Sequence, residues 1–170
     1  MRIVGILLLG LLAGCAVPPH VYLTWQGDTA TTMTVNFHTA RAVPSMVYYD
    51  TVPRGGVLAD YTLRAEGTAH QVPGVRDGRW VHTVELRGLA PGGTVYFAVA
   101  EGDAPVARER RFHTLPDDGR PIRFIDGGDV NALSEAGKML RAAAAWSPDF
   151  VSLGGDLAYE NGKTARSLLY

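Results

Sequence analysis

The feature that most constrains the fold is a series of short, partly alternating runs between residues 18 and 115. The runs are rich in Val, Tyr, Thr, Phe and Trp, and Gly, Pro, Asp or Asn lies between most of them, a pattern typical of strands joined by turns. They cover residues 21–26, 32–39, 45–50, 61–67, 79–86, 94–100 and 108–115. Seven strands at this spacing, with no helical period among them, predict an all-β sandwich.

Composition excludes two broad classes of protein. Apolar residues make up 46% of the chain and charged residues 19%, which indicates a globular chain rather than a disordered one. The net charge is -1, and the only lysines are Lys138 and Lys163, so the chain has no basic patch to attract nucleic acid. We therefore expect no nucleic-acid partner.

The first fifteen residues have the pattern of an export signal. Arg2 precedes an apolar run, residues 3–12, that is too short to span a bilayer. The run ends in Leu-Ala-Gly-Cys, which resembles the bacterial lipobox and implies a lipoprotein signal peptide over residues 1–15 with lipidation at Cys15. The chain would then be exported and lipid-anchored in the bacterial cell envelope, at the outer membrane or periplasmic face. The alternative is a plain secretory signal with an incidental cysteine.

Two motifs narrow the type of sandwich. In "LRGLAPGGTVYFAV" a Pro-Gly turn and Thr94-x-Tyr96 precede an apolar strand, which resembles the corner before the sixth strand of a fibronectin type III domain. That resemblance implies that the Tyr96 hydroxyl bonds to the backbone at the corner, and Trp25 is expected to fill the core. The opening "PPHVYLTWQGDTATTMTVNFHT" resembles the N-terminal fibronectin-like domain of purple acid phosphatases. We assign this domain to residues 18–115.

The pattern changes after residue 115. Residues 116–121 are rich in proline, glycine and acid and are interpreted as a linker. A short apolar strand at 122–126, a helix at 132–146 and a second apolar strand at 150–155 follow. A strand, a helix and a strand with short connections predict a right-handed βαβ unit, and thus the opening of an α/β domain over residues 122–170.

Two aspartates follow the two strands of this unit. Asp129 comes after "IDGG" and Asp156 comes after "SLGG", so each acid follows a pair of glycines just beyond a strand end. Ligands of parallel sheets bind at the carboxyl ends of strands, and glycines allow the backbone to turn there. Two carboxylates facing one cleft would repel each other unless a cation lay between them. The pattern therefore indicates a metal site.

The same segments resemble the first two motif blocks of calcineurin-like metallophosphoesterases. "GGDLAYENG" is similar to the second block of the purple acid phosphatase branch, which implies that Asp156 bridges two metals and that the Tyr159 phenolate binds a ferric ion. Asp129 matches the first-block aspartate at the same ferric site. The family usually has glycine two residues after that aspartate, where this chain has Asn131, and Asp126 is a rival. Asp129 is preferred because its double glycine mirrors the second block.

The resemblance implies acid phosphatase-like hydrolysis of phosphate esters by a binuclear centre, Fe(3+) with Zn(2+), Mn(2+) or Fe(2+). The family's remaining ligands come from later Gly-Asn-His and histidine blocks. The five histidines of this chain all precede the linker, at positions 20, 38, 70, 82 and 113. We interpret the chain as C-terminally truncated, with a metal centre that is incomplete and a fragment that is inactive alone. The alternative is a complete cell-surface lipoprotein that acts as a binding module, with a fibronectin-type domain and a relic α/β stub.

Overall fold

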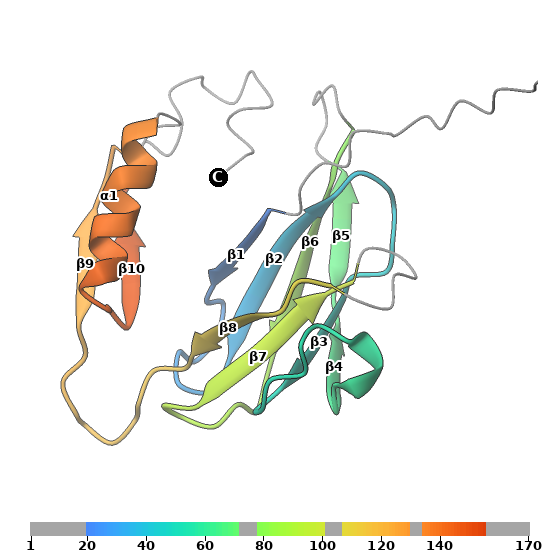
Figure 1. The fold of residues 1–170 in the computed structure, drawn as a ribbon, viewed down its shortest axis with the longest axis horizontal. Coiled ribbons are helices and arrows are strands. Elements are labelled where there is room, and N and C mark those ends of the chain that lie inside the picture. The colour runs from blue at the N-terminus through green and yellow to red at the C-terminus, as the bar shows by residue number, and fades with distance from the viewer. Residues whose placement is uncertain (1–19, 72–77, 101–106, 130–133, 156–170) are drawn as a thin grey trace, which may run out of the picture.

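A computed structural model describes residues 20–71, 78–100, 107–129 and 134–155 (Figure 1). Eight strands form the N-terminal region, and a strand, a helix and a strand follow it. The elements are β1 (Val21–Thr24), β2 (Met33–Thr39), β3 (Met46–Asp50), the 3-10 helix η1 (Leu58–Asp60), β4 (Leu63–Glu66), β5 (Thr68–Gln71), β6 (Trp80–Leu86), β7 (Thr94–Val99), β8 (Arg110–His113), β9 (Phe124–Gly127), α1 (Ser134–Ala145) and β10 (Phe150–Leu153).

The eight N-terminal strands form two four-stranded sheets that pack face to face, as the sequence predicts. One sheet has the order β1-β2-β6-β5 and the other β4-β3-β7-β8. Every pairing within them is antiparallel. We call this region, residues 20–115, the sandwich.

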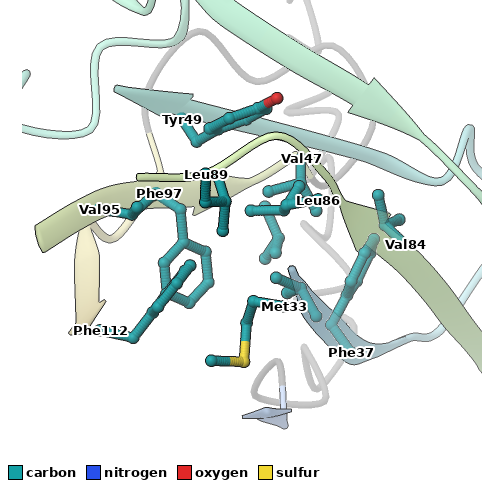
Figure 2. Packing of buried hydrophobic residues seen from close by; sticks show 12 residues of the cluster. Met33, Phe37, Val47, Tyr49, Val84, Leu86, Leu89, Val95, Phe97 and Phe112 are labelled. Carbon is teal, nitrogen blue, oxygen red and sulfur yellow. The ribbon is translucent and has the colours of Figure 1, made fainter. Parts of the chain in front are cut away.

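The core of the sandwich is made by alternate residues of both sheets (Figure 2). Because side chains alternate along a strand, the residues between them face outward. The rings of Phe97 and Phe112 meet at 5.8 Å between centroids, while Phe37 stacks on the His82 ring at 4.5 Å. The core residues from the sheet β1-β2-β6-β5 are Met33, Val35, Phe37, Val84 and Leu86. Those from the sheet β4-β3-β7-β8 are Val47, Tyr49, Val95, Phe97, Val99 and Phe112.

The structure has one strand, β5, that the sequence pattern did not predict. The run at 61–67 becomes β4 in one sheet, and the chain then crosses at Gly67 to form β5 in the opposite sheet. A Cβ at Gly67 would overlap the carbonyl oxygen of Thr83, so only glycine fits the crossing. Alternation shows which residues face a core, but it does not show that a strand changes sheets.

The corner before β7 is held by a threonine. Thr114 donates a hydrogen bond to the carbonyl of Ala90 (2.7 Å) and accepts one from the backbone N–H of Gly93 (2.9 Å). Tyr96 lies between the core residues Val95 and Phe97, so its half-buried side chain points to the outer face of the sheet.

The sandwich ends at Leu115. Its backbone N–H donates to the carbonyl of Thr29 (3.1 Å), and its carbonyl accepts from the N–H of Gly92 (3.0 Å). Residues 116–121 then lead away to β9, and Figure 1 shows this segment as a long loop between the two regions.

Residues 122–155 form what we call the second unit. Strands β9 and β10 pair in parallel, from Phe124 opposite Phe150 to Gly127 opposite Leu153. Helix α1 lies between them in the sequence, and its Ala136, Met139, Leu140 and Ala143 line a space together with Ile125, Val151 and Leu153 of the strands. The helix therefore covers one face of the strand pair. None of the helices in the described ranges is long and apolar enough to cross a membrane.

The apolar strands of the second unit are less covered than their sequences predict. Phe124 is 59% exposed, and Val151 and Leu153 are exposed as well. The described part of the unit has two strands and one helix, which is too small a layer to bury both faces of a sheet.

Candidate functional site

The carboxyl ends of β9 and β10 lie side by side. The last paired residues are Gly127 and Leu153. Beyond them, the N–H of Gly154 donates to the carbonyl of Gly127 at 2.7 Å. The two strands thus deliver their following loops to one edge, which we call the candidate edge: residues 127–129 and 154–155.

Glycines are required at this edge by close backbone contact. A Cβ at Gly128 would overlap the carbonyl oxygen of Gly154, and Gly155 has a φ of 84°. A side chain at either position would separate the two loops or strain the turn. The paired glycines of the two motifs therefore pack one loop directly on the other.

Asp129 follows directly after this glycine contact. Its φ is 52°, a left-handed conformation that is uncommon outside glycine but accessible to aspartate, and its side chain is exposed. The left-handed residue turns the chain just past β9, so Asp129 belongs to the candidate edge and not to the strand.

Asp126, the rival ligand, occupies a different place. It lies within β9 opposite Ser152 of β10. Phe124 and Phe150 stack on the side of the strand pair that faces Trp25, and alternation places the side chain of Asp126 on the same face as Phe124. Asp126 belongs to the face of the sheet, whereas Asp129 belongs to its edge.

The other predicted site residues lie outside the described residues. These are Asp156, Tyr159 and the predicted lipidation site Cys15. The described ranges contain no group of three or more His, Cys, Asp or Glu side chains arranged to hold a metal ion. Of the predicted metal ligands, the structure therefore describes Asp129 alone.

The sequence reading missed a carboxylate network in the sandwich. The Asp50 carboxylate accepts hydrogen bonds from Thr51 N–H (2.7 Å), Arg54 Nε (2.9 Å), and the hydroxyl (2.9 Å) and N–H (3.2 Å) of Thr62. Burial by itself would raise the pKa of Asp50, but these donors outweigh it and hold the pKa well below its ordinary value. The one sequence feature that could have indicated this network is an aspartate at the end of a strand, directly before a turn, where its carboxylate can accept backbone hydrogen bonds.

A second carboxylate closes the same loop. Glu109 accepts hydrogen bonds from Tyr61 Oη (2.7 Å) and Arg54 N–H (2.6 Å). Burial raises the pKa of Glu109, yet these bonds lower it more, while burial and the Glu109 charge raise the pKa of Tyr61. With both acids occupied by donors from the loop at 51–62, the network ties that loop to β3 and β8.

His82, one of the buried histidines of the sandwich, is also structural. His82 Nε2 lies 2.8 Å from Thr39 Oγ1, and Nδ1 lies 2.9 Å from Ser45 Oγ. Because the Thr39 hydroxyl donates to the carbonyl of Arg41, we infer that Nε2 carries the proton and Nδ1 accepts from Ser45. Burial lowers the pKa of His82. The ring is fully enclosed and both of its nitrogens have hydrogen-bond partners, so it is not a ligand for an outside group.

The two facing antiparallel sheets define a β-sandwich domain, and a parallel strand pair with one helix follows it. The family described as "Purple acid Phosphatase, N-terminal domain" matches residues 18–114, more than half of the chain. The chain therefore belongs to the family of purple acid phosphatase N-terminal domains. No curated protein matches the chain significantly.

Proposed function

We propose that this chain is the N-terminal part of an exported, metal-dependent phosphoesterase of the purple acid phosphatase type. Its second unit would open the calcineurin-like catalytic domain. The observation that carries the proposal is the candidate edge: in a chain whose sandwich belongs to the purple acid phosphatase family, two Gly-Gly-Asp motifs end adjacent parallel strands.

The local backbone fits a metal site. The backbone contact between Gly128 and Gly154 brings the two loops together at this edge, and Asp129 stands exposed beside the contact. Asp129, Asp156 and Tyr159 would hold the metals, with Fe(3+) at the tyrosine and Zn(2+), Mn(2+) or Fe(2+) beside it. A hard cation suits two carboxylates and a phenolate. When bound, a metal pair supplies Lewis-acid activation of a phosphate ester and of water.

The chain's own part in this chemistry is positioning. The parallel pair β9–β10 fixes the spacing of the two loops, and the left-handed backbone at Asp129 turns the chain just past the end of β9. The histidine ligands of the family have no counterpart after Asp129 in these 170 residues. We propose that residues outside this sequence complete the centre, and that lipidation at Cys15 anchors the protein at the cell envelope.

The direct test is metal binding by the 170-residue chain. We expect Fe(3+) to bind with a visible absorption band from the Tyr159 phenolate, and Tyr159→Phe to abolish the band. Asp129→Asn should weaken binding by at least about tenfold because it removes a charged ligand. Asp126→Asn and the linker variant Asp117→Asn are the matched controls and should bind as the wild type does.

Two results would contradict the proposal. A wild-type chain without specific metal binding would favour a surface binding module instead. Loss of binding in Asp126→Asn with normal binding in Asp129→Asn would reverse the assignment of the first ligand. We also expect little turnover of p-nitrophenyl phosphate, since the ligand set is partial, and fast turnover would show that no further ligands are needed.

A further inference from the structure

Trp25 lies where the sandwich meets the second unit. Its ring packs against the edge of the sandwich core, beside residues such as Met33 and Phe112. On its other side it meets the ring of Phe150 edge-on, with centroids 5.8 Å apart and planes at 85°. The sequence predicts that Trp25 fills the core, but the structure shows it bridging the core and the second unit.

The contact continues across both strands of the second unit. Phe150 stacks on Phe124 with centroids 5.3 Å apart and nearly parallel planes. These two residues are the first pair of the parallel strands, and Gly127 opposite Leu153 is the last. At about 3.3 Å per residue, the candidate edge lies about 15 Å further along the same strands. The aromatic contact thus holds the strand ends opposite to those that carry Asp129.

The junction around Trp25 is otherwise open. A cavity of about 560 Å³ lies beside it, with Leu23, Met33 and Phe112 on the sandwich side and Pro148, Asp149 and Val151 on the other. Among the described residues, Trp25 on Phe150 is the one ring contact between the two regions. The orientation of the second unit therefore depends on few packing atoms, and Trp25 provides the largest side chain among them.

The N–H group of the Trp25 indole is unfavourably placed. Its Nε1 is buried and has no hydrogen-bond partner among the described residues. Burying a donor without an acceptor is unfavourable. The ring, not its N–H group, is therefore what stabilises this position.

We propose that Trp25 is a positioning residue for the metal-binding edge, because it fixes the amino ends of β9 and β10 against the sandwich. The sandwich then sets the orientation of the candidate site without contacting it. The role in metal binding rests on the proposed function, whereas the aromatic contact itself does not.

The experiment is amide hydrogen exchange on the 170-residue chain, read at Val151 and Gly154 of the second unit and at Val84 and Phe97 of the sandwich. We expect Trp25→Ala to speed exchange at Val151 and Gly154 by about tenfold, the scale of a lost aromatic pair. Trp25→Phe keeps the ring contact and should exchange as the wild type does. Trp146→Ala, which removes an indole that is 76% exposed on the second unit, is the matched control and should also leave exchange unchanged.

Metal affinity supplies the second readout. Trp25→Ala should weaken Fe(3+) binding by about tenfold, as expected for a supporting residue, and Trp25→Phe should restore it. If Trp25→Ala also unfolds the sandwich, Phe150→Ala decides, since Phe150 lies outside the sandwich core and should produce the same faster exchange.

The outcomes separate the two proposals. Wild-type exchange at Val151 and Gly154 in Trp25→Ala, or in Phe150→Ala where the first variant unfolds, overturns the positioning role. So does an equal effect from Trp146→Ala. A wild-type chain that binds no metal overturns the proposed function, and the exchange measurements still decide whether Trp25 orients the second unit.

Discussion

The sandwich and the second unit are built from similar strands but bury them very differently. Phe97 in β7 is 1% exposed, whereas Phe124 in β9 is 59% exposed, although both lie in short apolar strands. In the sandwich each sheet covers the other, while the described second unit has one helix over one face of two strands. The comparison teaches that strand composition specifies a face to be buried, and that a second layer is needed to bury it.

The sharpest way to break this comparison is to truncate one phenylalanine in each region. Phe97→Ala should lower the free energy of unfolding of the sandwich by about 4 kcal/mol, because it leaves a cavity in a closed core. Phe124→Ala should change that free energy by less than about 1 kcal/mol. Urea unfolding followed by circular dichroism measures both. Equal losses would show that the two regions form one core.

Acid denaturation tests the carboxylate network that ties the loop at 51–62 to the sandwich. The folded-state pKa of Asp50 is held below its ordinary value near 3.8, so its contribution is complete above that pH and is lost as the pH falls through the lowered pKa. Asp50→Asn should reduce stability at pH 7 and flatten the loss of stability below pH 4. Unfolding midpoints between pH 2 and pH 7 measure this, with Asp60→Asn as an exposed control. If the stability of Asp50→Asn fell with pH in parallel with that of the wild type, Asp50 would not be the source of the acid sensitivity.

His82 adds a pH dependence in a higher range. Burial lowers its folded-state pKa below the ordinary 6.5, so the folded protein binds fewer protons than the unfolded chain in that window. Its contribution is therefore complete above about pH 6.5 and declines as the pH falls toward the lowered pKa. His82→Gln keeps a donor and an acceptor without titrating, and its stability should change less between pH 7 and pH 5. A steeper decline than that of the wild type would exclude His82 as the source.

The smallest change in the stability of the sandwich is expected from substitutions at the candidate edge of the second unit. Gly128→Ala places a Cβ against the carbonyl of Gly154, while Gly127→Ala meets no atom within 4 Å. We expect the first variant to speed amide exchange at Gly154 and weaken metal binding, and the second to change neither. Both should leave the unfolding transition of the sandwich within about 0.5 kcal/mol of the wild type. An equal response of the two glycine variants would remove the argument for a packed edge.

Much of the sandwich could be predicted from the sequence, because alternation records which residues face a core. All seven predicted runs contain strands, but β5, which begins directly after Gly67, was not predicted. The crossing depends on the distance from Gly67 to Thr83, which lies on another strand. The role of Thr114 at the corner and that of Glu109 likewise depend on partners distant in sequence.

For the candidate site, the sequence alone determined the residue types: two Gly-Gly-Asp motifs after apolar strands, and the family to which the first hundred residues belong. The tertiary structure decided which residues meet. It placed Asp129 at the edge and Asp126 on the face of the strand pair, packed Gly128 on Gly154, and turned Trp25 from the sandwich core toward Phe150. The physical reason is that a local pattern encodes conformation and polarity, whereas contacts between distant segments are set by how complete layers pack.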